Sequence, residues 1–345
     1  MDKPQIICHV EKSLGFSLFE CRWIPCSAKF IVLGSKPRGT GVIHVYEISE
    51  GDVKLVKEST SMSDSGSSNS VSDDFSILWK ACFFVFMAVF TNAFDLVCPS
   101  LTHVSSRNLE DTASPVYSAN GHKEIINCID GVGGLSIGCG APEIVTGGRD
   151  GNIQIYYIVL LKFGIPDRKE NLWQSWNHLR GLKQETVGQL HLVCSLEFDR
   201  KDIPMNKLVA TTLESKFYVF DVRTQHSKKG FTYLTEKVMV MFKEAHKATI
   251  WVARHLPQNR DVFATCGGAG SLCLWQYNYP SKRVTNDGDG ESIGVIGSLN
   301  LLQNITLATQ PISSFDWSPD KEGLAVCSSF DQTLRVIITT KLNTL

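Results

Sequence analysis

Short runs of alternating apolar and polar residues recur along this chain, and tight polar corners separate them. In the clearest case, residues 144–156 (IVTGGRDGNIQIY), two apolar strands flank the corner from Arg149 to Asn152. Alternation with a period of two is typical of half-buried β-strands, and Asp150-Gly151 at the corner favours a β-hairpin. An isolated hairpin is only marginally stable in water, so the pattern predicts that this one packs against similar sheets.

The same pattern repeats without gaps at three other places in the chain. Each copy has apolar residues at the positions of Ile153 and Ile155, and each follows a further alternating strand. The copies are LVATTLESKFYVF (208–220), FATCGGAGSLCLW (263–275) and AVCSSFDQTLRVI (325–337). Together with a looser copy that ends near Tyr46, the repeat predicts units of three or four antiparallel strands.

Strand units that recur about every 40 to 60 residues are typical of a β-propeller. We therefore expect an all-β fold, a WD-repeat β-propeller that forms one domain over residues 1–345. About five blades are expected to be intact, with degenerate segments between them. The last unit has only three strands before the chain ends, so Gln5–Val10 is predicted to supply its fourth strand and close the ring.

Pieces of the WD-repeat signature occur at matching positions of several units. In a WD repeat, a loop His, a Ser or Thr, a turn Asp and a closing Trp or Tyr hydrogen-bond to one another and hold the hairpin in place. The predicted members of this structural network are His122, Thr146, Asp150, Tyr156, His246, Thr265, Trp275 and Asp331. Ala269 takes the place of the turn Asp in the unit of His246, so a different contact must hold that blade.

A set of His, Thr and Asp also suggests a hydrolase, but an active site would not recur in successive units as this set does. The Gly-rich stretch Gly131–Gly140 lacks the spacing of a nucleotide-binding loop and lies between two strands. The 11 cysteines include no C-x-x-C pair, and the net charge is -1. We therefore expect no enzyme activity, catalytic residue, small-molecule substrate, cofactor, metal or nucleic-acid partner.

An interaction scaffold is the class of protein that this pattern favours. Loop aromatic and Arg side chains are good binding anchors, so Arg149, Trp251 and Phe330, beside the predicted turns, are candidates for a protein-binding face. The alternative is that each of these side chains only packs or is solvated. Unpaired cysteines in apolar strands and a charged N-terminus in place of a signal peptide lead us to expect a cytoplasmic protein.

Long phrases of the chain are more specific than the repeat itself. Examples are KPQIICHVEK, RGTGVIHVYEI, GHKEIINCIDGVGGLSIG, SLEFDRKDIPMNKLVATTLE and RHLPQNRDVFATCGGAGSLCLW. Through them the chain resembles the Monad-type WD-repeat family of axonemal dynein assembly factors over residues 1–58, 115–156 and 192–345. The resemblance implies a seven-bladed, non-catalytic adaptor of the cytoplasm and of dynein assembly particles.

The resemblance also implies partners. Proteins of this family are expected to link a co-chaperone complex to its clients, and to be required for the cytoplasmic preassembly and stability of axonemal dynein heavy chains. The complex contains RuvB-like ATPases, a PIH-domain subunit, an RNA polymerase-associated chaperone subunit and a heat-shock chaperone. An apoptosis-modulating role is the alternative that the same resemblance implies.

Two segments depart from the family pattern where the second and fourth blades belong. Residues 59–114 hold a Ser/Asp-rich tract and the aromatic run Ala81–Phe94, and residues 157–191 show no recognisable inner strand and Asp-turn hairpin. The abrupt junctions suggest a splice variant or a gene-model error, and a non-functional variant of this kind is an alternative to the adaptor. The aromatic run has 14 residues. A membrane-spanning helix needs roughly 20, so a membrane-tethered form through Phe83–Phe90 is disfavoured.

Overall fold

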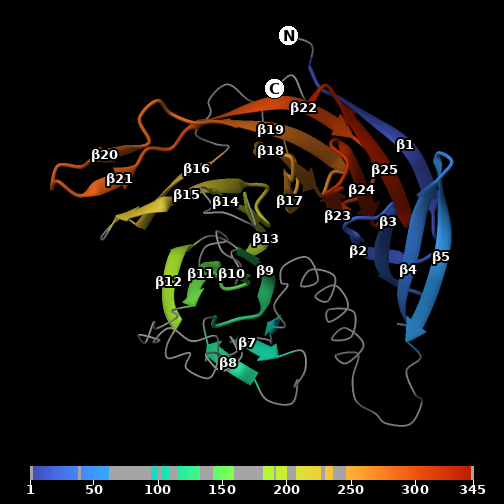
Figure 1. Cartoon of the computed structure of the whole chain (residues 1–345), viewed down its shortest axis with the longest axis horizontal. Coiled ribbons are helices and arrows are strands. Elements are labelled where there is room, and N and C mark those ends of the chain that lie inside the picture. The colour runs from blue at the N-terminus through green and yellow to red at the C-terminus, as the bar shows by residue number, and fades with distance from the viewer. Residues whose placement is uncertain are drawn as a thin grey trace, which may run out of the picture.

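A computed structural model of the chain describes residues 3–37, 40–61, 95–99, 103–108, 115–120, 122–132, 143–158, 182–189, 192–199, 207–226, 230–235 and 246–342. The regular elements within these residues are β-strands (Figure 1). Alternating side chains and short polar corners explain this, because the pleat of a strand sends successive side chains to opposite faces.

Five four-stranded antiparallel sheets form the blades, and each blade takes the name of its innermost strand. The β2 blade contains β2 (Ser17–Trp23), β3 (Lys29–Ser35), β4 (Gly41–Ser49) and β5 (Asp52–Ser61). The β9 blade contains β9 (Ile126–Val132), β10 (Glu143–Gly148), β11 (Asn152–Ile158) and β12 (Leu182–Gln189). The β13 blade contains β13 (Val193–Phe198), β14 (Lys207–Thr212), β15 (Phe217–His226) and β16 (Gly230–Thr235).

The two remaining blades come from the C-terminal part of the chain. The β17 blade contains β17 (Ile250–Leu256), β18 (Asn259–Gly267), β19 (Ser271–Asn278) and β22 (Ser298–Thr306). The β23 blade contains β23 (Ile312–Trp317), β24 (Leu324–Ser329), β25 (Thr333–Thr340) and β1 (Gln5–Ser13). Between β19 and β22 the chain forms the hairpin of β20 (Val284–Asn286) and β21 (Ser292–Gly294), which contacts β15.

The blades follow one another around a common centre (Figure 1). Their innermost strands contact each other in the order β9, β13, β17, β23 and β2. This arrangement is a β-propeller, and it confirms the predicted all-β fold with about five intact blades. A further sheet of three strands contains β6 (Asp95–Pro99), β7 (His103–Asn108) and β8 (Pro115–Asn120).

The N-terminal strand completes the last blade, as the sequence predicts. β1 pairs antiparallel with β25 from Gln5 opposite Thr340 to Ser13 opposite Thr333, with one irregularity between Cys8 and Val10. The outer strand of the β23 blade therefore comes from the opposite end of the chain, and its hydrogen bonds join the two termini into one ring.

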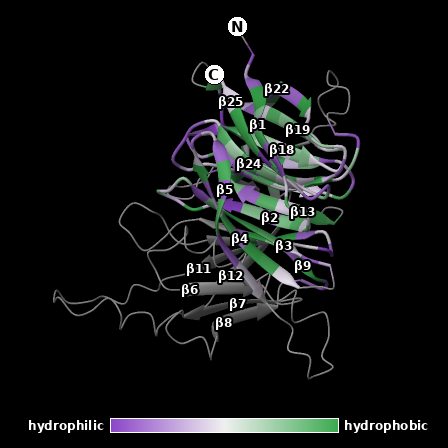
Figure 2. Ribbon diagram, turned by 90° about the vertical axis from the view of Figure 1, so that its right-hand side faces the viewer, coloured by the Kyte–Doolittle hydropathy of each residue, from purple (hydrophilic) through white to green (hydrophobic). Residues whose placement is uncertain are grey.

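The core lies between neighbouring blades rather than within one sheet. In Figure 2 the strands of the blades are mostly hydrophobic, and hydrophilic residues gather in the loops. Separate clusters of buried apolar side chains fill the four interfaces from the β9 blade to the β2 blade. Every residue of β14 is buried, because this strand is covered on both faces. Packing against similar sheets therefore stabilises hairpins that would be only marginally stable alone.

Much of the two anomalous segments lies outside the described residues, including the Ser/Asp-rich tract and the aromatic run Ala81–Phe94. The described strands in the first segment are the end of β5, β6 and β7. Those in the second are the end of β11 and β12, which is the outer strand of the β9 blade. Within the residues that the structure describes, no helix has the length and apolar character needed to cross a membrane.

Candidate functional site

The turn between the second and third strands has the same backbone conformation in four blades. One residue of each turn has a positive φ: Gly151 (77°), Ser215 (61°), Gly270 (70°) and Gln332 (64°). These four residues occupy the same position of the sequence repeat. The corner that the sequence predicts at Gly151 is therefore kept in blades that have Ser or Gln there, although the left-handed conformation is less favourable for residues with a Cβ.

A second feature recurs two residues earlier in each turn. The backbone N–H donates a hydrogen bond to a carbonyl of the loop that leads into the innermost strand of the same blade. The pairs are Arg149 to Ile125 (2.7 Å), Leu213 to Leu192 (3.1 Å), Gly268 to Thr249 (2.6 Å) and Phe330 to Pro311 (2.9 Å). The four turns therefore lie beside the entry loops at one end of the blades, and we call this end the turn face.

In the β9 blade, the predicted histidine network forms around His122. Its Nε2 lies 2.7 Å from Thr146 Oγ1 and its Nδ1 lies 3.0 Å from Asp150 Oδ1, while the other oxygen of Asp150 accepts the N–H of Lys123. Burial alone would raise the pKa of Asp150, but hydrogen bonds from His122, Lys123 and Asn152 lower it to about 2. The side chain of Tyr156, the fourth predicted member, lies outside the described part of the structure.

In the β17 blade, Ser271 takes the place of the missing turn carboxylate. His246 Nε2 lies 2.7 Å from Thr265 Oγ1, which also accepts the indole N–H of Trp275 at 2.8 Å. His246 Nδ1 lies 3.1 Å from Ser271 Oγ, whereas the side chain of Ala269 is exposed. Burial lowers the pKa of His246 from its ordinary value of 6.5 to about 4. A different contact therefore holds this blade, as the sequence predicts. The one sequence signal for that contact was the position of Ser271 within the turn.

Asp331, the last predicted member, is bound by an arginine rather than a histidine. Arg335 Nη2 lies 2.9 Å from Asp331 Oδ2 and 3.1 Å from Glu11 Oε1, and Asp331 Oδ1 also accepts the hydroxyl of Ser329. Burial raises the pKa of Asp331, but the bonds from Arg335 and Ser329 lower it below its ordinary value. Because Glu11 lies on β1, this ion-pair network also joins the turn to the strand that closes the ring.

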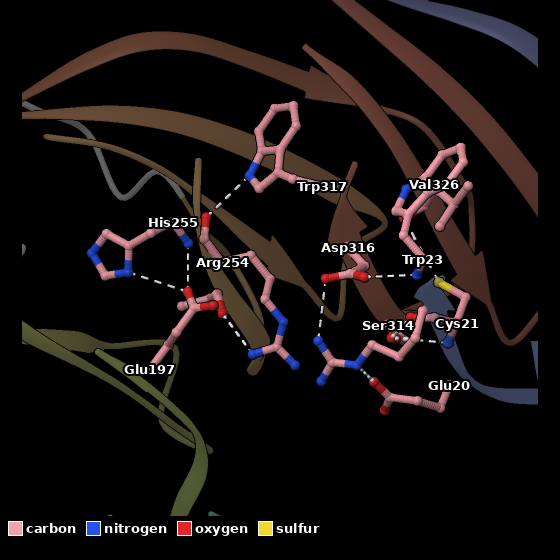
Figure 3. A network of polar contacts seen from close by, with 12 residues as sticks. Glu20, Cys21, Trp23, Glu197, Arg254, His255, Ser314, Asp316, Trp317 and Val326 are labelled. Carbon is pink, nitrogen blue, oxygen red and sulfur yellow. Dashed lines mark hydrogen bonds and ion pairs between the residues drawn. The ribbon is translucent and has the colours of Figure 1, made fainter. Parts of the chain in front are cut away.

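Carboxylates of the innermost strands join neighbouring blades, and the sequence analysis missed them. Asp130 accepts the N–H of Phe198 at 2.8 Å, and Asp316 accepts that of Trp23 at 2.9 Å. In the same way, Glu197 accepts the N–H of His255 (Figure 3). Each acid stands at the same register position of its strand, opposite the centre of the second strand. An acidic residue repeated in otherwise apolar strands was the available signal.

The β17 blade breaks this series, because Arg254 stands at the acidic position. Its backbone carbonyl accepts the indole N–H of Trp317 from the next blade at 3.2 Å, so a bond across the interface is kept (Figure 3). Between the β23 and β2 blades, the guanidinium of Arg22 binds Asp316 at 3.2 Å and Glu20 at 2.7 Å. These charged groups are therefore used in contacts within the propeller.

The structure places the three candidate binding residues on the turn face. Arg149 is exposed in the turn of the β9 blade, and Phe330 is 44% exposed in the turn of the β23 blade. Trp251 is partly buried at the start of β17, and its ring lies 6.5 Å from that of Phe330. Two exposed apolar residues of this face were missed, Ile125 (43%) and Leu213 (44%). Leu213 occupies the same repeat position as Arg149 and Phe330, which was a usable signal.

Four-stranded blades around a centre, together with the loop-His and Thr contacts, define a WD-repeat β-propeller. A model of the family described as WD domain, G-beta repeat matches residues 300–337. Propellers of this class typically serve as non-catalytic scaffolds. Among the residues that the structure describes, no three His, Cys, Asp or Glu side chains form a candidate metal site.

Relatives resemble the chain over its whole length. It is 47% identical to dynein axonemal assembly factor 10 of Xenopus laevis, with 100% of this chain and 99% of the relative covered. It is 46% identical to the Homo sapiens protein of the same name and 40% identical to that of Chlamydomonas reinhardtii, each with 99% of this chain and 98% of the relative covered. The chain belongs to the dynein axonemal assembly factor 10 family.

Proposed function

We propose that this protein is a non-catalytic adaptor of the cytoplasm that supports the assembly of axonemal dyneins. The full-length identity of 47% to a dynein axonemal assembly factor is the observation that carries this proposal. The two histidine networks support the non-catalytic part, because the His–Thr pair that suggests a hydrolase makes the same contact inside two blades.

Complementation tests the proposal directly. The chain is expressed in a Chlamydomonas reinhardtii strain that lacks its own relative, and dynein heavy chains are measured by mass spectrometry of isolated axonemes. We expect the heavy chains to return. A strain that expresses the Trp275→Ala chain is the control, because this substitution removes a fully buried side chain and should strongly destabilise the propeller. Persistent loss of heavy chains, with the wild-type chain folded and present, would contradict the proposal.

We further propose that the adaptor links axonemal dynein heavy chains to a co-chaperone complex. The complex contains RuvB-like ATPases, a PIH-domain subunit, an RNA polymerase-associated chaperone subunit and a heat-shock chaperone, and the family resemblance of the long sequence phrases supports it. Affinity purification of the tagged chain from ciliated cells should recover the RuvB-like ATPases together with dynein heavy chains. Recovery of general heat-shock proteins alone would indicate a misfolded product and would overturn this part.

We also propose that residues 59–114 and 157–191 derive from altered splicing or from a gene-model error. The alignment with the Xenopus laevis relative spans 376 residues, whereas this chain has 345, so the relative contains residues with no counterpart in this chain. Sequencing of the transcript across both segments tests the idea. A single continuous cDNA that encodes both segments in all tissues would rule it out.

A further inference from the structure

We infer that β1 is a strap that opens by itself while the blades stay folded, and that the ion pairs of Arg335 form the latch that controls this opening. This inference does not depend on the proposed adaptor function. The other four blades take their outer strand from the part of the chain that follows their own third strand. β1 instead continues into β2 of the neighbouring blade, so noncovalent contacts alone hold it on the β23 blade.

β1 makes few apolar contacts. Of its nine residues, Ile6 is the buried one (8% exposed), and Val10 is partly buried against the core cluster of the β2 blade. The pairing with β25 is also irregular between Cys8 and Val10, which interrupts the ladder. In β25, by contrast, six of the eight residues are buried. A segment that buries little apolar surface opens at a low free energy, whereas a buried strand opens only with the whole domain.

The contact between the β23 and β2 blades does not require β1. Their shared cluster of buried apolar side chains comes from strands β2 to β5, β24 and β25, together with Phe16. At the innermost strands, Asp316 accepts the N–H of Trp23 at 2.9 Å. Ser314 Oγ accepts the N–H of Cys21 at 3.2 Å. Because β1 lies at the opposite, outer edge of the blade, its opening frees the edge of β25 and leaves the two blades in contact.

The latch joins β1 to the turn of the β23 blade. Arg335 lies opposite Glu11 in the register of the two strands, and its Nη2 is 3.1 Å from Glu11 Oε1. The same Nη2 is 2.9 Å from Asp331 Oδ2, and Nη1 donates to Ser329 Oγ at 2.6 Å, so the turn fixes the guanidinium. The side chain of Glu11 is 59% exposed, whereas that of Arg335 is 5% exposed. Glu11 can therefore leave for water while the buried cation keeps Asp331, which avoids the cost of an unpaired buried charge.

Single hydrogen bonds attach the two ends of the strap to the neighbouring blades. Lys12 Nζ donates to the carbonyl of Val53 in the β2 blade at 2.7 Å. Near the other end, Gln303 Nε2 of the β17 blade donates to the carbonyl of Pro4 at 3.3 Å. Between β1 and β2, Gly15 has a φ of 73°, and an added Cβ there would have no neighbour within 4 Å. A glycine in open space permits large changes of the backbone angles, so we assign Gly15 as the pivot of the opening.

Hydrogen exchange in urea tests whether β1 opens separately. Amide exchange of the full chain is followed by mass spectrometry of peptic fragments, at urea concentrations below the unfolding transition. We expect β1 to exchange at least about tenfold faster than β24, at a rate that changes little with urea, because a local opening exposes little surface. β24 should show the steep urea dependence of global unfolding. Equal rates with equal urea dependence in the two strands would overturn the inference.

Glu11→Gln tests the latch. The substitution keeps the shape of the side chain and removes its charge, and the exposed position of Glu11 makes unfolding of the variant unexpected. Exchange of β1 should become about two- to fivefold faster, as expected for the loss of one partly exposed ion pair, while exchange of β24 stays the same. An unchanged rate in β1, or an equal rise in β1 and β24, would show that the ion pair does not control the strap.

Salt and a matched variant separate the latch from a general loss of charge. Sodium chloride at about 0.5 M should speed the exchange of β1 in the wild type and have a smaller effect in Glu11→Gln, because salt screens an exposed ion pair. The control is Lys216→Gln, which removes the pair of Lys216 with Glu214 at 2.9 Å in the β13 blade and should leave β1 unchanged. Equal salt effects on β1 in the wild type and in Glu11→Gln would also overturn the inference.

Discussion

The turns of the β9 and β17 blades and those of the β13 and β23 blades have the same backbone but different side chains. In the first pair, a loop histidine reaches over a glycine, and a Cβ on that glycine would overlap the ring nitrogen of His122 in one blade and lie 2.5 Å from that of His246 in the other. In the second pair, Thr212 and Ser329 occupy the glycine position, and their hydroxyls bond within the turn. The backbone pattern is therefore the constant feature, and the histidine network is one of two ways to complete it.

The comparison also explains why the WD signature is weak in this chain. A histidine over the turn requires glycine beneath it, whereas a hydroxyl residue at that position makes the histidine unnecessary. Replacing the glycine alone makes the new side chain overlap the histidine, and replacing the histidine alone leaves its Thr or Asp partner without that hydrogen bond. The expected changes in the free energy of unfolding differ in size, and the largest follow from substitution of the most deeply buried side chains.

Trp275→Ala should have the largest effect. Trp275 is buried, its N–H binds Thr265, and its ring packs at 5.0 Å from that of Phe217 in the neighbouring blade. Loss of a buried Trp side chain typically lowers the free energy of unfolding by about 3 to 5 kcal/mol. Urea unfolding followed by fluorescence and circular dichroism would measure the change. A loss below about 1 kcal/mol would mean that the β17 blade does not depend on this contact.

The second prediction concerns the loss of stability at low pH that is caused by His246. Because burial lowers the pKa of His246 to about 4 in the folded protein, the unfolded chain binds a proton near pH 6.5 and the native protein does not. The free energy of unfolding should therefore fall as the pH is lowered from about 6.5 to about 4, by about 3 kcal/mol for this residue. The measurement is the difference in pH dependence between the wild type and His246→Gln.

The β9 blade should respond to acid in a different range. The pKa of Asp150 is lowered to about 2, so its contribution is present above its ordinary value of 3.8 and is lost as the pH falls toward 2. Comparison of Asp150→Asn with His246→Gln separates the two ranges. If both variants changed the pH dependence only below pH 4, His246 would not be the neutral ring without a carboxylate partner that we assign.

A glycine substitution tests the rule that histidine requires glycine. Gly267→Ala should lower the free energy of unfolding by about 1 to 3 kcal/mol, because its Cβ would be forced against His246. The matched control is Gly288→Ala, at a position where an added Cβ has no neighbour within 4 Å. Thermal unfolding of both variants provides the comparison. Equal stability of the two variants would show that the histidine moves aside at no cost.

The sequence was sufficient to predict features that depend on local pattern. The period of two located the strands, the repeated corner located the positive φ at Gly151, and the unpaired last unit predicted the pairing of Gln5–Val10 with β25. Residues distant in sequence decided the rest. That Arg335 would bind Glu11 on β1, and that Asp130 would reach the next blade, depends on which side chains become neighbours only after distant strands and sheets assemble.

Ala269→Asp should have the smallest effect and gives the sharpest test of the comparison. Ala269 occupies the position of Asp150, and the turns share their positive φ and their tethered N–H. An aspartate there should bind His246 Nδ1 in place of Ser271, raise the pKa of His246 and increase the free energy of unfolding by about 0.5 to 1 kcal/mol at neutral pH. NMR titration of the His246 ring and urea unfolding would measure both changes. Ala269→Asn is the control, because it offers the same shape without the charge and should leave the pKa nearly unchanged. A pKa of His246 that stays near 4 in Ala269→Asp would mean that Ser271 holds the ring out of reach, and that the two histidine turns are alike only in their backbone.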